Sequence, residues 1–152
     1  MFKQRLVPLL CGSLLLTGCV GTEPMAQAVI AEPVQAVSAD INCDGETDHI
    51  RLLYPEGENQ VKVEVTLGGD QGVSALRFGL SDSTRQNALC GAVADLEVVP
   101  GDADALAQIL GEVPRGYQAG EQCSDLVLRG GECDSINLYW DHSRRHLNWW
   151  RL

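Results

Sequence analysis

The sequence has few basic residues and lacks the short motifs of several enzyme and metal-site classes. Lysine and arginine together number 11 against 21 acidic residues, which gives a formal net charge of −10 and a pI of about 4.6. A chain this acidic repels phosphate groups, so nucleic-acid binding and polybasic attachment to anionic membranes are excluded. The sequence contains no CxxC, no HExxH and no Gly-x-Ser-x-Gly, the motifs of structural zinc sites, zinc peptidases and many serine hydrolases.

The sequence also lacks an apolar run of the roughly 20 residues that a membrane-spanning helix needs. Its longest apolar stretch, Leu6–Leu16, is short, follows Lys3 and Arg5, and ends in Leu-Thr-Gly-Cys at residues 16–19. This order is typical of an export signal, and its end resembles the lipobox of bacterial lipoproteins. The resemblance implies that residues 1–18 are removed and that Cys19 is acylated, with palmitate-type chains, as the new N-terminus. The alternative is a plain secretory signal that happens to end in cysteine.

Residues 19–39 are interpreted as the lipidated cysteine and a flexible tether. The stretch contains Pro24 and Pro33 and shows no regular hydrophobic period, and a flexible chain of this length spans roughly 25 Å. Val20, a residue other than aspartate, follows the cysteine. By resemblance to the enterobacterial sorting pattern, this implies an outer-membrane lipoprotein, which we expect to face the periplasm. Loss of residues 1–18 would leave nine basic against 21 acidic residues, a net charge of −12.

Four cysteines remain after Cys19, and an even number in an oxidising compartment predicts two disulfides. Three pairings are possible. Cys123 and Cys133 flank a short apolar stretch and a Gly-Gly turn, and a disulfide between them could staple a hairpin. Cys43 and Cys90 would then pair and close a longer loop. A zinc site is the less favoured alternative, because the spacings are wrong for it. The cysteines are Cys43, Cys90, Cys123 and Cys133.

Residues 40–152 are predicted to form one domain that is mainly β, a small antiparallel sheet or sandwich with one short helix; an α+β fold is the alternative. Period-2 alternation is cleanest over Val61–Leu67. The helix is predicted over Ala103–Leu110, after Asp102 as cap and before Gly111. No repeat of 20–50 residues is visible, which excludes a propeller. Further strands are predicted over residues 50–54, 74–80, 88–99, 126–129, 135–140 and 146–152.

An acidic loop at residues 40–48 is the sharpest local motif. Oxygen-bearing side chains occupy loop positions 1, 3, 5 and 9, with glycine at position 6, and position 7 would offer its backbone carbonyl. Ca²⁺ prefers six to eight oxygen ligands, so the loop is a predicted calcium site of structural role. The alternative is a metal-free turn whose carboxylates accept backbone N–H groups. The candidate ligands are Asp40, Asn42, Asp44, Glu46 and Asp48.

The loop departs from an EF-hand, because position 12 is Arg51 and a strand follows. It is similar to the D-x-[DN]-x-D-G-x-x-D loops of FG-GAP and VCBS-type β repeats, over about 15 residues. That resemblance implies the loop chemistry alone.

Aromatic residues are scarce, yet four of the eight lie in the last 14 residues. The pattern predicts a hairpin that turns at residues 142–145. Because strand neighbours face opposite sides, the four rings cannot all enter one core. Aromatic packing within the hairpin is the favoured interpretation, and exposed rings that bind a partner or a glycan are the alternative. The candidate binding residues are Trp140, Trp149 and Trp150. This ending resembles uncharacterised exported bacterial proteins, which implies no activity.

The sequence therefore predicts a lipid-anchored, non-catalytic binding domain of the bacterial envelope, with one calcium ion as the expected cofactor. Its expected partners are peptidoglycan or a basic periplasmic protein. One alternative is an inhibitor or immunity protein against a cell-wall-degrading enzyme, since such enzymes are often basic and an acidic domain would be steered toward them. A second alternative is a hydrolase of envelope glycans.

Overall fold

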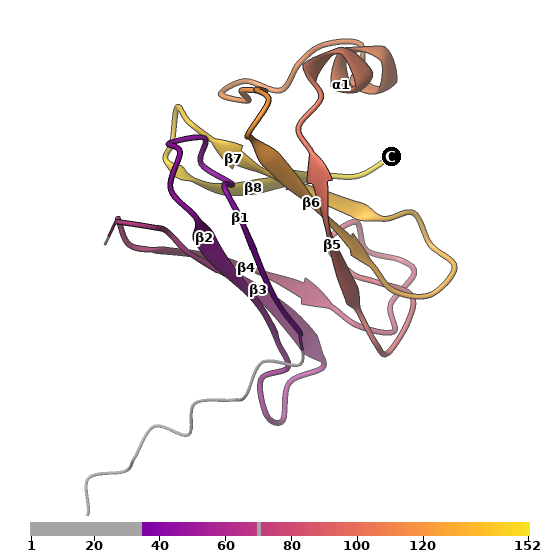
Figure 1. Ribbon diagram of the computed structural model, residues 1–152. Coiled ribbons are helices and arrows are strands. Elements are labelled where there is room, and N and C mark those ends of the chain that lie inside the picture. Colours follow the sequence, from indigo (N-terminus) through magenta and orange to yellow (C-terminus); the bar gives the residue numbers. More distant parts are fainter. Residues whose placement is uncertain (1–34, 70) are drawn as a thin grey trace, which may run out of the picture.

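Two four-stranded antiparallel sheets and one short helix make up the computed structural model, which describes residues 35–69 and 71–152 (Figure 1). The first sheet is β1 (Gln35–Ala39), β2 (Asp48–Leu53), β3 (Gln60–Thr66) and β4 (Val73–Gly79). The second is β5 (Asp95–Pro100), β6 (Ser124–Arg129), β7 (Ile136–Asp141) and β8 (His146–Trp150). In each sheet, spatial order follows chain order, so the mainly β prediction is confirmed. The predicted signal peptide, Cys19 and most of the tether lie outside the described residues.

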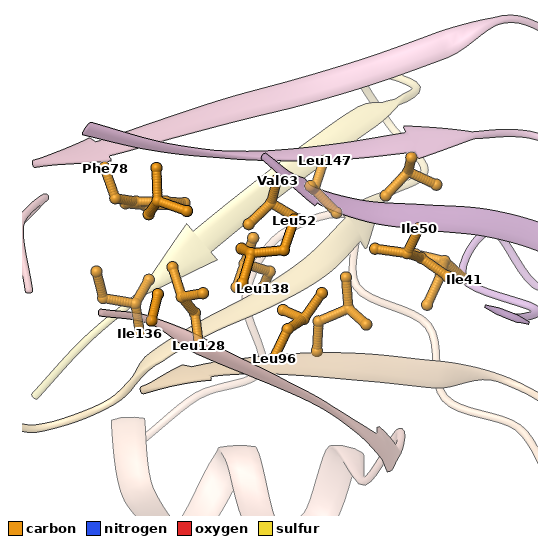
Figure 2. Packing of buried hydrophobic residues seen from close by; sticks show 14 of the residues in the cluster. Ile41, Ile50, Leu52, Val63, Phe78, Leu96, Leu128, Ile136, Leu138 and Leu147 are labelled. Carbon is orange, nitrogen blue, oxygen red and sulfur yellow. The ribbon is translucent and has the colours of Figure 1, made fainter. Parts of the chain in front are cut away.

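The core lies between the two sheets, where their apolar side chains meet (Figure 2). In β3, Val61, Val63 and Val65 are fully buried, and they pair in register with Phe78, Leu76 and Ser74 of β4. This is the alternation that the sequence predicts for this strand. In Figure 2, side chains of the first sheet face side chains of the second across the core, among them Ile50, Leu52 and Val63 on one side and Leu96, Leu128 and Leu138 on the other.

Polar side chains join the open edges of the two sheets. The amide of Gln35 in β1 donates to the carbonyl oxygen of Leu96 in β5 (2.6 Å) and accepts from its N–H (2.9 Å). On the other side, the Ser74 hydroxyl of β4 accepts from the N–H of Leu147 in β8 (2.9 Å). An unpaired strand edge is a template for aggregation. Here both pairs of edges are partly occupied by contacts within the domain.

The helix α1 (Ala103–Leu110) covers the outer face of the second sheet, as predicted in position and caps. The Asp102 carboxylate accepts from the N–H of Ala105 (2.9 Å), and Gly111 ends the helix in the left-handed conformation at φ 82°. Leu106 packs with Tyr117 and Tyr139 in a second apolar cluster on that face. The second sheet thus contributes side chains to apolar clusters on both of its faces.

The two predicted disulfides are present, but they do not include the Cys123–Cys133 hairpin staple, one of the three pairings that the sequence allows. Cys43 bonds to Cys123 and Cys90 to Cys133, with Cα–Cα distances of 4.9 and 5.7 Å. Cys123 and Cys133 cannot pair because the six-residue strand β6 separates them, and an extended strand adds about 3.3 Å per residue. Cys43–Cys123 therefore joins the β1–β2 connection to the start of β6, and Cys90–Cys133 joins the β4–β5 connection to the β6–β7 connection at the opposite end of the sandwich.

The predicted start of the domain at Asp40 is also wrong. Gln35–Ala39, assigned to the tether, forms β1 and pairs with all but the last residue of β2. Its side chains are small apart from Gln35 and Val37, so the alternation of polar and apolar residues is weak. The strand is defined by its pairing with β2 instead. The predicted strand at residues 88–99 shrinks to β5, and Ala88 makes only a single bridge, to Gly79.

Candidate functional site

Three hairpin connections meet at one end of the sandwich, which we call the loop end (residues 40–47, 67–69, 71–72 and 142–145). Strand pairing places them there, because the last pairs of the three hairpins are Ala39–Asp48, Thr66–Val73 and Asp141–His146. The first described residue, Gln35, begins β1 at the opposite end. The loop end contains all of the predicted calcium ligands except Asp48, which begins β2 beside it.

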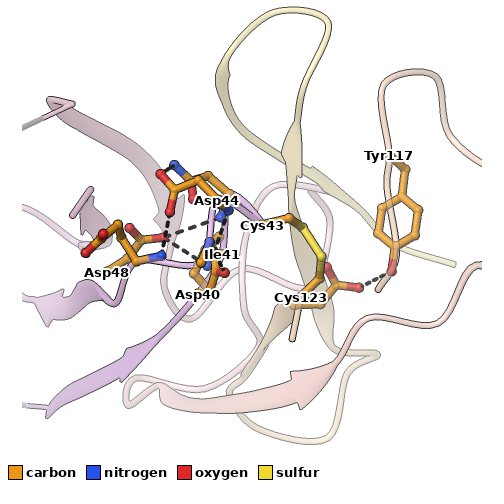
Figure 3. Close-up of a disulfide and its surroundings, with 11 residues drawn as sticks. Asp40, Ile41, Cys43, Asp44, Asp48, Tyr117 and Cys123 are labelled. Carbon is orange, nitrogen blue, oxygen red and sulfur yellow. Dashed lines mark hydrogen bonds between the residues drawn. A yellow bond between two sulfur atoms is a disulfide. The ribbon is translucent and has the colours of Figure 1, made fainter. Parts of the chain in front are cut away.

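The acidic loop folds as a chain of hydrogen bonds between its carboxylates and its own backbone (Figure 3). Asp40 accepts from the N–H groups of Asp44 (3.2 Å) and Gly45 (2.8 Å). Asp44 accepts from the N–H of Glu46 (2.8 Å), and this bond lowers the pKa of its carboxyl group. Gly45 has φ 85°, the left-handed conformation that the glycine at position 6 predicts.

A second oxygen of Asp44 is held by two side-chain amides. Asn42 donates to it from 2.8 Å, and Gln71 donates from the neighbouring β3–β4 connection at 2.5 Å. Asn42 is buried, whereas Asp44 and Gln71 are exposed. Asp44 thereby ties two loops together at the surface.

Asp48 is fully buried, and its carboxylate accepts only backbone N–H groups. Its donors are Ile41 (2.9 Å), Asn42 (3.4 Å) and Gly68 (2.9 Å). A buried carboxylate is costly unless it is hydrogen-bonded, and three donors meet that requirement here. Asp48 fixes the base of the acidic loop against the β3–β4 connection.

These contacts correspond to the metal-free turn that the sequence allows. Oxygens of Asp40, Asp44 and Asp48 accept hydrogen bonds, and Glu46 is exposed. Within residues 35–69 and 71–152, no three acidic, histidine or cysteine side chains are grouped to hold a metal ion. Calcium binding by the loop stays a prediction.

A disulfide attaches this loop to the second sheet. Cys43 has φ 61° and bonds to Cys123, the residue before β6. The next residue, Ser124, donates its N–H to the carbonyl oxygen of Asp40 (2.9 Å). Figure 3 shows the disulfide between the acidic loop and the segment of Tyr117. The acidic loop is therefore held by the second sheet, through Cys123 and Ser124, and by the β3–β4 connection, through Asp48.

The C-terminal aromatic rings divide between the two apolar clusters, as their alternation predicts. Trp140 is 7% exposed and belongs to the main core. Trp149 packs edge-on against Phe78, with ring centroids 5.9 Å apart. Trp150 and Tyr139 lie in the cluster under α1. Trp149 and Trp150 are half-buried, so aromatic packing accounts for most of this surface.

Trp140 also lines a pocket at the loop end, with a volume of about 230 Å³. The sequence could not place this pocket, because its walls come from three separate connections. Its lining is mixed in chemistry, with two apolar side chains, two amides, a carboxylate, a guanidinium group and an imidazole. The lining residues are Asn42, Asp44, Leu67, Gln71, Trp140, His142 and Arg145.

The β7–β8 turn that forms one wall is fixed by Asp141. This buried carboxylate accepts from the N–H groups of Ser143 (2.9 Å) and Arg144 (3.1 Å) and from the Ser143 hydroxyl (2.6 Å). The hydroxyl bond is the main cause that lowers the pKa of Asp141. Arg145 adopts φ 56° at the end of the turn. Burial lowers the pKa of His142, which favours a neutral ring in the wall.

A half-buried acid lies beneath the helix, and nothing in the sequence indicates it. Asp125 of β6 accepts from the Tyr117 hydroxyl (2.8 Å). Burial raises the pKa of Asp125 to about 6 and raises the pKa of Tyr117 as well. The two residues pack under the helical cover, away from the pocket lining, so we assign them to stability.

The histidines show no enclosed catalytic arrangement in the part of the chain that the structure describes. His49 lies 3.1 Å from the Ser38 hydroxyl across the β1–β2 pair, and both are exposed. A serine is normally activated where water is excluded. His146 contacts the carbonyl oxygen of Leu147 (2.7 Å).

Comparison of the chain with protein-family models, with curated proteins and with solved structures finds no match. Residues 35–69 and 71–152 contain no helix long and apolar enough to cross a membrane.

Proposed function

We propose that this protein is a lipid-anchored, non-catalytic binding domain of the bacterial envelope, attached to the outer membrane and facing the periplasm. The observation that carries the proposal is the loop end, where three fixed connections surround a small pocket with an indole in its wall. Preorganised surfaces of this kind lose little conformational entropy on binding. The export signal and lipobox supply the predicted location.

The position of the loop end supports this role. The chain enters β1 at Gln35, at the opposite end of the sandwich. A tether from Cys19 that joins the domain there would leave the loop end directed away from the bilayer. The pocket would then face the periplasmic space and the cell wall.

A structural calcium ion in the acidic loop is part of this proposal. The loop carries side-chain oxygens at alternate positions, and the pKa of Asp44 is lowered by the hydrogen bond from the Glu46 N–H, which favours its charged form. The ion would replace backbone N–H groups at oxygens of Asp40 and at the Asp44 oxygen that accepts from Glu46. Its role would be to hold the acidic loop in place.

Inhibition of, or immunity to, a cell-wall-degrading enzyme is the second candidate. Exposed acidic side chains on the acidic loop and near the start of α1 favour it, because they would attract a basic enzyme. Glu46, Asp102 and Asp104 are examples. An envelope glycan hydrolase is the weaker alternative, since it would require catalytic groups in an enclosed site.

Sedimentation with purified cell walls tests the first proposal. The full-length chain, in detergent, is expected to pellet with peptidoglycan sacculi and to leave their chain length unchanged. A soluble complex with one basic envelope enzyme, together with loss of that enzyme's activity, would favour the inhibitor instead. Release of soluble sugars from the sacculi would establish a hydrolase. If the chain binds neither sacculi nor an envelope enzyme, the binding role is refuted.

A further inference from the structure

The pocket at the loop end has a composition that selects among ligand classes. It carries one carboxylate, from Asp44, and one guanidinium group, from Arg145. An ammonium ligand would meet the guanidinium group, and a carboxylate ligand would meet Asp44. A charged ligand of either sign would therefore be repelled by one of these two groups. A neutral polar ligand is favoured.

The polar groups in the wall are planar and both donate and accept hydrogen bonds. The amides of Asn42 and Gln71 each offer two donors and an acceptor, and both now converge on the same oxygen of Asp44 (2.8 and 2.5 Å). Adjacent hydroxyl groups of a sugar ring can each accept from an amide N–H and donate to a carboxylate. Asp44 and Gln71 are exposed, so such a ring can reach them.

The apolar part of the wall fits the other face of a sugar. Trp140 and Leu67 line the pocket and are themselves packed in the main core. The C–H groups of a sugar ring pack against an indole, as other apolar groups do. A volume of about 230 Å³ lies below the roughly 300–1,000 Å³ of pockets that hold drug-sized ligands, which limits the occupant to about one ring.

The frame around these groups is fixed before any ligand arrives. The Cys43–Cys123 disulfide and the three donors to Asp48 hold the acidic loop, and Asp141 holds the turn of Arg145. Groups with locked positions bind at a smaller entropic cost.

We propose that the loop-end pocket is a subsite for one neutral sugar ring, with Trp140 as its apolar wall and Asp44, Asn42 and Gln71 as its hydrogen-bonding groups. This inference rests on the proposed binding function and names its ligand class. The ring would be one residue of an envelope glycan.

Titration with soluble sugars tests the subsite. The full-length chain, in a detergent without a sugar head group, is titrated with tetrasaccharides of N-acetylglucosamine and of glucose, and the indole N–H signals are followed by NMR. Saturable shifts at Trp140 are expected with at least one tetrasaccharide. Lysine and glutamate are the charged controls, and tighter binding of either would overturn the inference.

Matched variants identify the contact residues. Asp44→Asn should weaken sugar binding about tenfold, since a hydrogen bond to a charged group is lost. Glu56→Gln removes the same charge from an exposed turn outside the pocket lining, and should leave the affinity unchanged. Trp140→Phe and Trp149→Phe form a second pair, and only the first should weaken the affinity, which is measured by calorimetry because Trp140→Phe removes the reporting indole. If each control variant weakened sugar binding as much as its partner at Asp44 or Trp140, the subsite would be contradicted.

The outcomes separate this inference from the proposed function. If neither tetrasaccharide binds but the chain still sediments with sacculi, the sugar subsite is refuted and the binding role stands. If neither sacculi nor tetrasaccharides bind, both fail.

Discussion

Replacement of Asp125 by asparagine should remove a pH dependence of stability that the fold imposes. The Asp125 carboxyl group lies under the helical cover and meets the Tyr117 hydroxyl at 2.8 Å. Burial raises its pKa from 3.8 to about 6. The folded state therefore holds the proton over a range of pH in which the unfolded chain has already released it.

The sign follows from this difference in bound protons. Between about pH 4 and pH 6 the folded state binds more protons at Asp125, so this group's contribution to stability falls as the pH rises. The full effect, from below pH 4 to above pH 7, is at most about 3 kcal/mol, and the part between pH 5 and pH 7 is about 1.3 kcal/mol. Above pH 7 the ionised, half-buried carboxylate destabilises the fold, so Asp125→Asn should be more stable than the wild type there.

Urea unfolding of both proteins from pH 4 to pH 8 measures this effect, as the free-energy difference between them at each pH. Subtraction removes the other titrating groups. His142, whose pKa is lowered by burial, makes folding less favourable as the pH falls through its range. It titrates in the wild type and in the variant alike, so its contribution cancels in the difference. Tyr117→Phe is a control that keeps the carboxyl group. A free-energy difference that stays constant over this range would refute the assignment of a raised pKa to Asp125.

Three further results are expected. Cys19→Ser should move the protein from the membrane fraction to the soluble fraction, and continued sedimentation with membranes would contradict the lipoprotein prediction. Excess Ca²⁺ after chelation should raise the melting temperature by several degrees, since a ligand at 100 times its dissociation constant adds roughly 2.7 kcal/mol; the rise should be absent in Asp44→Ala, and no rise in the wild type would leave the acidic loop as a metal-free turn. Peptide mapping without reduction should recover the disulfides Cys43–Cys123 and Cys90–Cys133, and any other pairing would contradict the placement of β6 between its flanking cysteines.

The sequence predicts the elements in which one local pattern suffices. β3 has an uninterrupted period of 2, and α1 has a capping aspartate and a terminal glycine, so both lie where they were expected. β1 was missed because small side chains give Gln35–Ala39 little pattern of its own. The disulfide pairing was missed for a different reason, since it depends on which end of the sandwich each cysteine occupies.

The acidic loop shows a limit of a different kind. Calcium loops and Asx-rich turns both need alternating side-chain oxygens and a glycine of positive φ, so one sequence pattern predicts either. In this fold, Asp40 accepts from two N–H groups and Asp48 from three. The distinction depends on how many oxygens the backbone leaves for an ion, which only the folded geometry determines.

The two ends of the sandwich can therefore serve separate purposes. The loop end is held by the Cys43–Cys123 disulfide, by Asp48 and by Asp141, whereas the chain enters through β1 at the other end. A bound ligand at the pocket would meet a frame that keeps its shape, and a pull on the tether would load β1, whose edge is joined to β5 through Gln35. Because β1 pairs with β2 along its whole length, such a load would be spread over the first sheet before it reached the pocket. The proposed attachment to a membrane and the proposed binding at the loop end are thus mechanically compatible in this small domain.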